Sequence, residues 1–352
     1  MKIALVGAGI LGRLLALACH RQGWAVTLFD QDTPEGTQSC TYTGAGMLSP
    51  TAELDLCEPL ISELGRASLV LWPEILATLV KPVFFQQAGT LVVAHQRDQA
   101  ELQRFKRSIQ AKGPAPIEEI SDIQQLEPAL SGRFQRGLYL PGEGQIDNRQ
   151  LLDSLKETIL SVGIDWQWGV HVPSVTCQKD YDWTIDCRGL GAQPQWHALR
   201  GVRGEIVTVH APEVTLNRPI RLMHPRYPLY IVPREDHRFL IGATSIESQD
   251  RRPITVQSAL ELLSAAFSVH PGFSEATILE MNVNCRPTLP DNLPQIQVEA
   301  GLMRINGLYR HGFLLAPKLV ELAVTILSGK IIAEDSLCSL LLMTNPPSFQ
   351  MT

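Results

Sequence analysis

The residues best suited to chemistry stand at the start of the chain, where three glycines and an acid have the spacing of a dinucleotide site. Gly7, Gly9 and Gly12 form a G-x-G-x-x-G run between an apolar strand-like segment and an apolar helical segment, and Asp30 ends the next strand-like segment. The first glycine permits a tight turn, the second lets a pyrophosphate approach the backbone, and the third lets helix and strand pack closely. A carboxylate at Asp30 can accept hydrogen bonds from a ribose diol. This motif predicts a dinucleotide and by itself allows NAD as readily as FAD.

Two further residues could hold a carboxylate. The planar guanidinium of Arg286 can bind a carboxylate through two parallel hydrogen bonds, and the hydroxyl of Tyr230 can donate one more. Taken alone, the same residues fit a surface arginine before a proline and a half-buried strand tyrosine. None of the nine histidines forms an HxxxH pair, and the seven cysteines show no CxxC pair, so no metal site is predicted.

Composition limits the class of protein and its partners. The 352 residues are 45% hydrophobic and 19% charged with a net charge of -6, which fits a globular protein and excludes a basic surface for nucleic acid or anionic lipid. The odd, scattered cysteines indicate a reducing compartment, and we expect a cytoplasmic protein. The apolar run from Lys2 to Cys19 is similar to a secretory or lipoprotein signal, but Arg13 and the glycines interrupt it, and a β-α unit explains it better. No stretch is long enough for a membrane span.

The elements that must position these residues alternate between helix and strand. The first helix is expected to stop near Gly23, and the Thr-, Ser-, Gly- and Pro-rich residues 31–50 are predicted to form a loop. Gly312 could let the backbone approach a planar ring, with a final helix beginning near Pro317. That helix would point its positive end at whatever lies in front of it, although a plain helix entrance with a glycine hinge explains the residues equally. Helices are also predicted over 61–80, 98–112, 151–162 and 256–269, a strand over 89–94, and a cluster of strands between 203 and 244.

Six short motifs, which lie between residues 7 and 317, are informative when taken together. They are GAGILG at 7–12 followed by Asp30, GAGML at 44–48, YIVPR at 230–234, GAT at 242–244, CRP at 285–287 and RHGFLLAP at 310–317. In this order and spacing the chain resembles the D-amino acid oxidase superfamily of FAD enzymes, and within it the glycine oxidase branch. The resemblance implies an α/β protein with two domains, a Rossmann-like FAD-binding domain and a discontinuous β-rich substrate-binding domain. The implied FAD-binding domain covers 1–80, 142–203 and 284–352, and the implied substrate domain covers 81–141 and 204–283.

The resemblance also implies how FAD is held. Gly7, Gly9 and Gly12 would meet the pyrophosphate, Asp30 the adenosine ribose, Thr41 a phosphate, and the backbone of Val172 the adenine, while Gly46 and Met47 would lie along the isoalloxazine. The remaining implied FAD contacts are Gly189, Gly312, Phe313, Leu314 and Leu315. Residues 186–191 depart from the Gly-x-Trp-Ser pattern of the family, which leaves the adenosine-side contacts open. Some sarcosine-oxidase-type relatives attach flavin covalently through a cysteine near the position of Cys285, but the surrounding residues favour non-covalent FAD.

The implied reaction is oxidation of a small amino acid. Arg286 and Tyr230 would bind the substrate carboxylate, Arg310 would lie near the amine or the flavin edge, and Met47 would narrow the pocket. Glycine is the expected substrate, with sarcosine and D-alanine as alternatives. Hydride transfer to flavin and reoxidation by O2 would give the imine, then glyoxylate and ammonia, with H2O2, and the imine would serve thiamine thiazole synthesis with a thiazole synthase as partner.

Other functions stay open at this point. A D-amino acid dehydrogenase would pass electrons to a quinone or partner protein, and a non-catalytic subunit would bind FAD without turnover. A nicotinamide dehydrogenase is the interpretation that remains if the C-terminal match is fortuitous. The exact substrate, the use of oxygen and a homo-oligomeric state are not determined by these motifs.

Overall fold

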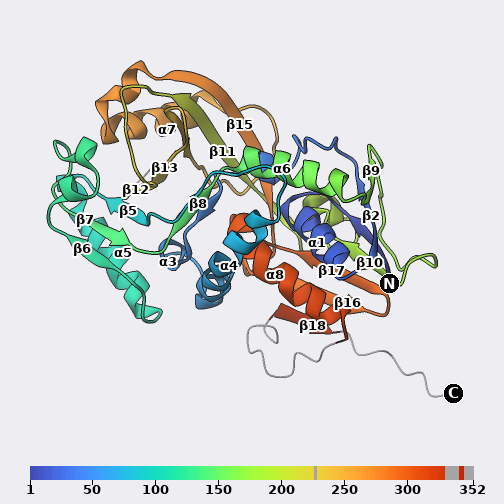
Figure 1. Ribbon diagram of the computed structural model, residues 1–352. Helices are drawn as coiled ribbons and strands as arrows, with labels where there is room; N and C mark the ends of the chain where they lie inside the picture. Colours follow the sequence, from blue (N-terminus) through green and yellow to red (C-terminus); the bar gives the residue numbers. More distant parts are fainter. Residues whose placement is uncertain (226–227, 330–340, 345–352) are drawn as a thin grey trace.

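Two large sheets, each assembled from segments far apart in sequence, organise the chain (Figure 1). The computed structural model describes residues 1–225, 228–329 and 341–344. The first sheet has seven strands in the order β18-β16-β17-β10-β1-β2-β9, and the second has eight in the order β15-β11-β14-β13-β12-β5-β7-β6. Strands β3, β8 and β4 form a third, small sheet. The mixed α/β architecture predicted from the sequence is confirmed.

The seven-stranded sheet is a parallel, Rossmann-like sheet with an antiparallel extension. Strands β17, β10, β1, β2 and β9 run parallel, and β16 pairs antiparallel with β17. Ile3 and Leu5 of β1 are fully buried, as expected for a central strand with helices on both faces. Its strands are β1 (Lys2–Val6), β2 (Ala25–Asp30), β9 (Asp165–Trp168), β10 (Trp183–Asp186), β16 (Gln295–Glu299), β17 (Leu302–Asn306) and β18 (Leu342–Thr344).

The eight-stranded sheet is mostly antiparallel. Its longest strands, β11 and β15, pair along eleven register positions from Arg200↔Thr288 to His210↔Thr277. The strands are β5 (Thr90–Val93), β6 (Glu118–Ile120), β7 (Gly137–Leu140), β11 (Arg200–His210), β12 (Ile220–Leu222), β13 (Leu229–Pro233), β14 (Arg238–Gly242) and β15 (Thr277–Thr288). The small sheet contains β3 (Met47–Leu48), β4 (Phe85–Gln86) and β8 (Gly144–Ile146).

The helices cover the sheets in two groups. Helices α1, α4, α6 and α8 pack with one another and with the seven-stranded sheet, while α7 packs on β11, β13 and β14 and α5 on β7. The helices are α1 (Ile10–Arg21), α2 (Cys40–Thr43), α3 (Pro50–Glu53), α4 (Pro59–Ala77), α5 (Gln99–Ala111), α6 (Asn148–Ser161), α7 (Val256–Val269) and α8 (Gly312–Leu327). Short 3-10 turns cover Gln96–Asp98, Ile123–Gln125, Pro128–Leu130, Gly189–Ala192 and Pro271–Glu275. Within the described residues, no helix is long and apolar enough to cross a membrane.

The last helix begins earlier than the sequence predicted. It starts at Gly312, and Pro317 lies inside it. Proline has no N–H to donate to the carbonyl four residues earlier, which belongs to Phe313. The indole N–H of Trp72 donates to that carbonyl at 3.1 Å instead, so the bond that Pro317 cannot make is replaced by one from α4. Trp72, which makes this replacement, lies 241 positions away in the sequence.

Residues 31–50 contain more structure than the predicted loop. They include α2, β3 and the first residue of α3. Ser39 caps α2 by accepting a hydrogen bond from the N–H of Tyr42 at 3.2 Å. These elements have two to four residues, which is too short for hydrophobic periodicity to reveal them. The boundaries at 80, 141, 203 and 283 between the two domains stay predictions, although three separate parts of the chain do supply the seven-stranded sheet: β1 with β2, β9 with β10, and β16 with β17 and β18.

Candidate active site

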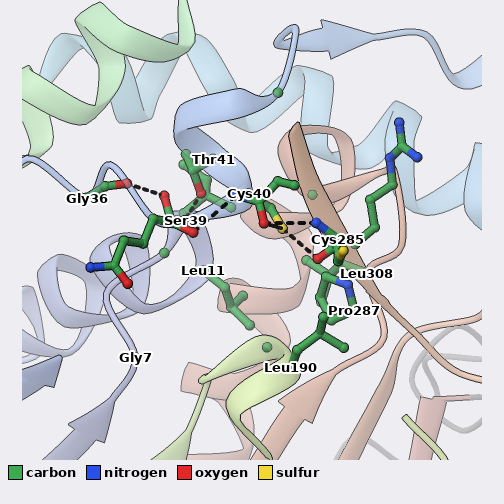
Figure 2. Close-up of a pocket in the computed structure, with 18 of the residues that line it drawn as sticks. Gly7, Leu11, Gly36, Ser39, Cys40, Thr41, Leu190, Cys285, Pro287 and Leu308 are labelled. Atoms are coloured by element: carbon green, nitrogen blue, oxygen red, sulfur yellow. Dashed lines mark hydrogen bonds between the residues drawn. The ribbon is translucent and has the colours of Figure 1, made fainter. Parts of the chain in front are cut away.

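One elongated cavity of about 370 Å³ is lined by residues of both large sheets. This volume lies within the range of small-molecule sites. Its walls come from the carboxyl ends of β1 and β2, the segment from α2 to β3, strands β13 and β15, and the start of α8. Figure 2 shows the wall where α2 meets β15, with the thiol of Cys40 donating to the carbonyl oxygen of Cys285 at 3.0 Å.

The glycine-rich turn forms one end of the cavity. Gly7 has a φ of +106°, and a Cβ there would meet the carbonyl oxygen of Cys187 at 2.5 Å, so the turn needs glycine. Gly9 lines the cavity and caps α1, and a Cβ on it would have only the hydroxyl of Thr41 nearby, at 3.7 Å. Gly12 does not line the cavity. A Cβ there would lie 1.8 Å from the carbonyl oxygen of Gly7, so the close packing of helix and turn needs glycine at this position. The three predicted glycines therefore divide into one that shapes the turn, one that faces the cavity and one that permits packing.

Asp30 and Thr41 lie beside this turn. The carboxylate of Asp30 accepts hydrogen bonds from the N–H groups of Ala8 and Asp32, and it lines the cavity. The hydroxyl of Thr41 accepts the N–H of Ile10, at the start of α1, at 2.9 Å. The positive end of α1, the Asp30 carboxylate and a hydroxyl thus converge as a pyrophosphate and a ribose require.

A buried arginine holds this end of the site together. Arg13 donates to the carbonyl oxygens of Ala8 at 2.8 Å, Pro34 at 2.7 Å and Leu152 at 3.1 Å. These carbonyls belong to the glycine-rich turn, the loop after β2 and helix α6. In the sequence, Arg13 only interrupted an apolar run, and nothing pointed to this role.

The segment that departs from the family pattern has a clear structural role. Arg188 forms an ion pair with Asp186 at 2.7 Å and donates to the carbonyl oxygen of Val172 at 2.7 Å and to Gln195 at 2.8 Å. Val172 and Gly189 line the cavity, and Gly189 has a φ of +56°, while their contacts with FAD stay predictions. Arg188, which the sequence analysis quoted without a role, therefore positions this part of the cavity wall.

The middle of the cavity is shaped by Gly46 and Met47. Gly46 has a φ of +63°, and a Cβ there would lie 1.9 Å from the carbonyl oxygen of Ile146. Arg234, the last residue of the YIVPR motif, fixes this loop by donating to the carbonyl oxygens of Ala45 at 2.5 Å and Ile146 at 2.9 Å. Met47 packs in an apolar cluster with Tyr230 and lines the cavity.

The start of α8 forms the opposite wall. Gly312 and Phe313 line the cavity, and the N–H groups of a first helical turn have no partner within their own helix. Leu314 and Leu315 are buried in the core and do not line the cavity, with Leu314 packed on Gly65 of α4. If Leu314 and Leu315 contact FAD as predicted, the contact must come from their backbone atoms, because both side chains point into the core.

The predicted carboxylate clamp lies at the substrate end. Nη1 of Arg286 donates to the carbonyl oxygens of Thr244 at 3.1 Å and Arg203 at 3.3 Å, and its other nitrogens make no hydrogen bond to the described part of the chain. The buried hydroxyl of Tyr230 also lacks a partner among the described residues, and burial raises the pKa of this phenol. Both residues line the cavity and keep donors for a ligand. Cys285 lines it as well, with its sulfur 3.6 Å from the carbonyl oxygen of Asp250, and non-covalent FAD stays a prediction.

Arg310 also lines the cavity but already has a partner. Its Nε and Nη2 lie 2.7 and 2.6 Å from Oε2 of Glu53. The same oxygen lies 2.8 Å from Nε2 of His311, whose buried ring does not line the cavity and is 3.4 Å from the thiol of Cys57. Burial lowers the pKa of His311, which keeps it neutral. Glu53, Cys57 and His311 could together ligate a metal by geometry, but the arginine paired with Glu53 opposes a cation there.

A buried carboxyl group lies behind the cavity and predicts a pH effect on stability. Oε1 of Glu143 accepts the N–H groups of Thr51 at 2.9 Å and Ala52 at 2.7 Å, and Oε2 has no partner in the described chain. Burial raises the pKa of Glu143 from 4.5 to about 7, against the effect of the two amides. Between these pH values the unfolded chain releases a proton that the folded chain keeps, so stability falls as pH rises.

Replacing Glu143 with Gln should remove this dependence, because the amide oxygen can accept both N–H groups without a titrating partner. We expect a flatter unfolding free energy between pH 4.5 and 7 and a gain on the order of 3 kcal/mol at pH 8. Denaturant unfolding of apoprotein across this range measures both. Glu118→Gln, at an exposed position of β6, serves as the control. A Glu143→Gln protein with the wild-type slope would contradict the assignment.

Fold and site together define a class of protein. A parallel sheet supplies a glycine-lined cradle and an acid at one end of the cavity, and a β-rich half supplies tyrosine and arginine at the other. The cradle at Gly9, which a Cβ would enter without meeting protein, fits the pyrophosphate of a dinucleotide. The arrangement is that of an enzyme with a dinucleotide cofactor and room for a small ligand beside it.

Comparison with known proteins gives the family. The model of the DAO family, described as FAD dependent oxidoreductase, matches residues 2–324. The "Putative thiamine biosynthesis oxidoreductase ThiO" of Rhizobium etli is 42% identical over 319 residues, covering 91% of this chain and 94% of that protein. The chain belongs to the DAO family of FAD-dependent oxidoreductases. The cofactor predicted from the C-terminal motifs is confirmed, and the nicotinamide interpretation is set aside.

Two further relatives extend this result. The crystal structure of glycine oxidase from Geobacillus kaustophilus superposes with a TM-score of 0.81 at 24% identity, covering 94% of this chain and 96% of that one, which confirms the fold. The "Bifunctional protein ThiO/ThiG" of Trichormus variabilis is 26% identical over 338 residues, covering 90% of this chain. The chain spans about half of that protein, 51% of its length.

Proposed function

We propose that the protein oxidises glycine to the imine, which hydrolyses to glyoxylate and ammonia, with oxygen reduced to H2O2. The observation that carries this proposal is the pair of unsatisfied donors on Arg286 and Tyr230 in a narrow part of the cavity. The printed name of a curated relative, the glycine oxidase of Geobacillus kaustophilus, supports glycine as the substrate. The overall change, glycine with O2 and H2O giving glyoxylate, NH3 and H2O2, balances in atoms and electrons.

The chain's own residues bind and orient the substrate. Arg286 would hold the carboxylate bidentately through Nε and Nη2, since Nη1 is anchored by two carbonyls, and Tyr230 would donate from β13 of the same sheet. Met47 and the apolar cluster around it would limit the group on the α-carbon to hydrogen or methyl. Bound FAD would supply the redox chemistry, as the acceptor of a hydride from the α-carbon and the donor of electrons to oxygen. Catalysis by the protein is then mainly orientation, and no acid–base residue is required.

The FAD site is proposed to follow the lining of the cavity. Gly7, Gly9, Asp30 and Thr41 would hold the diphosphate and ribose, and Val172 and Gly189 would lie at the adenosine end. The first turn of α8, with Gly312 and Phe313, would stabilise negative charge on the reduced ring. The backbone N–H of Leu314 belongs to the same turn and would add to this effect. Leu315 would act only as packing, because its N–H donates to the carbonyl oxygen of His311.

The same imine would feed thiazole formation in thiamine synthesis. Support comes from the printed names of two relatives, one a thiamine biosynthesis oxidoreductase and one a bifunctional ThiO/ThiG protein. A thiazole synthase is the partner that this function requires, since the imine hydrolyses in water. We also propose a cytoplasmic setting, which the odd number of scattered cysteines supports.

The direct test is a spectrum and a substrate panel. Purified protein should carry bound flavin that bleaches anaerobically with glycine, and the same addition in air should release H2O2. Sarcosine and D-alanine belong in the panel. Flavin that stays oxidised with all three would overturn the proposal. Bleaching with negligible oxygen consumption would instead indicate a dehydrogenase that passes electrons to a quinone or partner protein.

A further inference from the structure

The substrate end of the cavity contains two arginines, only one of which is free to bind an anion. Arg310 is paired with Glu53 through two nitrogens at 2.6 and 2.7 Å. Arg286 makes no ion pair within the described residues, and its contacts are backbone carbonyls. We call these three residues, Arg286, Arg310 and Glu53, the substrate wall. It carries two positive charges, and the carboxylate of Glu53 is its negative charge.

Glu53 is held firmly in this arrangement. It ends α3, has a relative exposure of 9%, and its Oε2 also contacts the imidazole of His311 at 2.8 Å. Burial opposes ionisation of Glu53, but Arg310 and His311 outweigh it and lower the pKa of this carboxyl group. Glu53 is therefore an anion throughout the working range of pH.

The remaining charged groups around this wall are paired, neutral, exposed to solvent or set back from the cavity. Arg221, which stacks on Tyr230 from the next strand, is paired with Asp55 at 3.4 Å. Arg104 reaches the other oxygen of Asp55 from α5 at 3.4 Å and is half exposed to solvent. His311 is buried and unprotonated, and Glu143 lies behind the wall without lining it. Arg251 also lines the cavity, but from an exposed position where solvent screens its charge, so the partly buried cation that keeps donors free for the substrate is Arg286.

We propose that Glu53 determines charge specificity: by neutralising Arg310, it restricts the site to amino acids with one carboxylate and rejects N-carboxymethyl amino acids, whose second carboxylate would approach Arg310. This inference rests on the proposed function, which places the substrate carboxylate on Arg286. Without the anion, Arg310 would become a second carboxylate site at the amine side. With it, a second carboxylate meets a buried negative charge and finds no free cation.

Two amine-free ligands provide the test. Methoxyacetate has the shape of sarcosine and one carboxylate, while diglycolate has the shape of iminodiacetate and two. Neither contains an amine to oxidise, so their dissociation constants can be measured on oxidised holoenzyme from the change in the flavin absorption spectrum. The wild type should bind methoxyacetate more tightly than diglycolate. Equal or tighter binding of diglycolate by the wild type would overturn the proposal without any variant.

The variant Glu53→Gln is nearly isosteric and removes the charge. We expect the ratio of diglycolate to methoxyacetate affinity to rise at least about tenfold, on the scale expected for one unit charge in a partly buried site. The ratio of kcat/KM for iminodiacetate to that for sarcosine should rise in parallel. Glu53→Asp keeps the charge and should keep the wild-type ratio, and adding Arg310→Met to Glu53→Gln should restore that ratio.

The outcomes separate three cases. If Glu53 only positions its neighbours, Glu53→Gln will weaken both ligands equally and leave the ratio unchanged, which contradicts the inference. Reduction of the wild-type flavin by glycine, together with an unchanged ratio, leaves the proposed function intact while overturning this inference. A wild type that binds neither ligand and is reduced by none of the amino acids contradicts the proposed function itself.

Discussion

Replacing Arg286 with Met should lower kcat/KM for glycine by about a hundredfold or more and act mainly through KM. The guanidinium is the free cation in the substrate wall, and charge-assisted bidentate bonds to a carboxylate are among the strongest single contacts in proteins. Flavin content should remain that of the wild type, because Arg286 lies at the substrate end of the cavity. Steady-state kinetics and the flavin spectrum measure both quantities.

Arg286→Lys is the matched control that separates the effect of the positive charge from the effect of the planar guanidinium. Lysine keeps the positive charge but cannot reproduce the planar fork, nor hold the carbonyl oxygens of Arg203 and Thr244 in the same way. Its kcat/KM should lie between those of wild type and Arg286→Met. An unchanged KM in Arg286→Met would show that the substrate carboxylate binds elsewhere.

Replacing Gly9 with Ala should weaken FAD binding at least about tenfold while leaving the apoprotein as stable as wild type. A Cβ at Gly9 meets only the hydroxyl of Thr41, at 3.7 Å, so the folded chain has room for it. The space that this methyl group enters is where the backbone must approach the pyrophosphate. Titration of apoprotein with FAD, followed by flavin fluorescence, gives the affinity, and thermal unfolding of the apoprotein gives the stability.

Gly12→Ala tests the other role of glycine in the same motif. Its Cβ would lie 1.8 Å from the carbonyl oxygen of Gly7, so the helix and the turn could not keep their packing. We expect this variant to lose stability without FAD, by on the order of 1–3 kcal/mol as for other overpacked sites. Wild-type FAD affinity in Gly9→Ala would place the pyrophosphate away from the turn.

Much of the nucleotide half could be predicted because its signals are local. The turn at Gly7, the helix that follows and the acid at the end of β2 all lie within thirty residues, and each follows from backbone conformation or from the period of apolar residues. The C-terminal motifs added the cofactor, which the family match confirms. The start of α8 and the short elements between 31 and 50 were missed, since both depend on contacts rather than on periodicity.

The residues that support the site were not predictable in this way. Arg234 holds Ala45 from 189 positions away, and Arg13 reaches Leu152 across 139. In a sequence, an arginine that will bind backbone carbonyls cannot be distinguished from an arginine on the surface, because its partners are backbone atoms that every residue has. Arg188 stood in a quoted motif, yet its partners Val172 and Gln195 become visible only in the structure.

The sequence by itself determined that this chain binds a dinucleotide, that the dinucleotide is FAD, and that the cofactor lies in an α/β fold, because glycine conformation and the order of short motifs are properties of the chain itself. The tertiary structure alone decided which charges meet. Glu53 and Arg310 are 257 residues apart, and their ion pair exists only because α3 and the start of α8 close on the same cavity. Electrostatic interaction depends on distance in space, so the charge offered to the substrate is fixed only when the chain is folded.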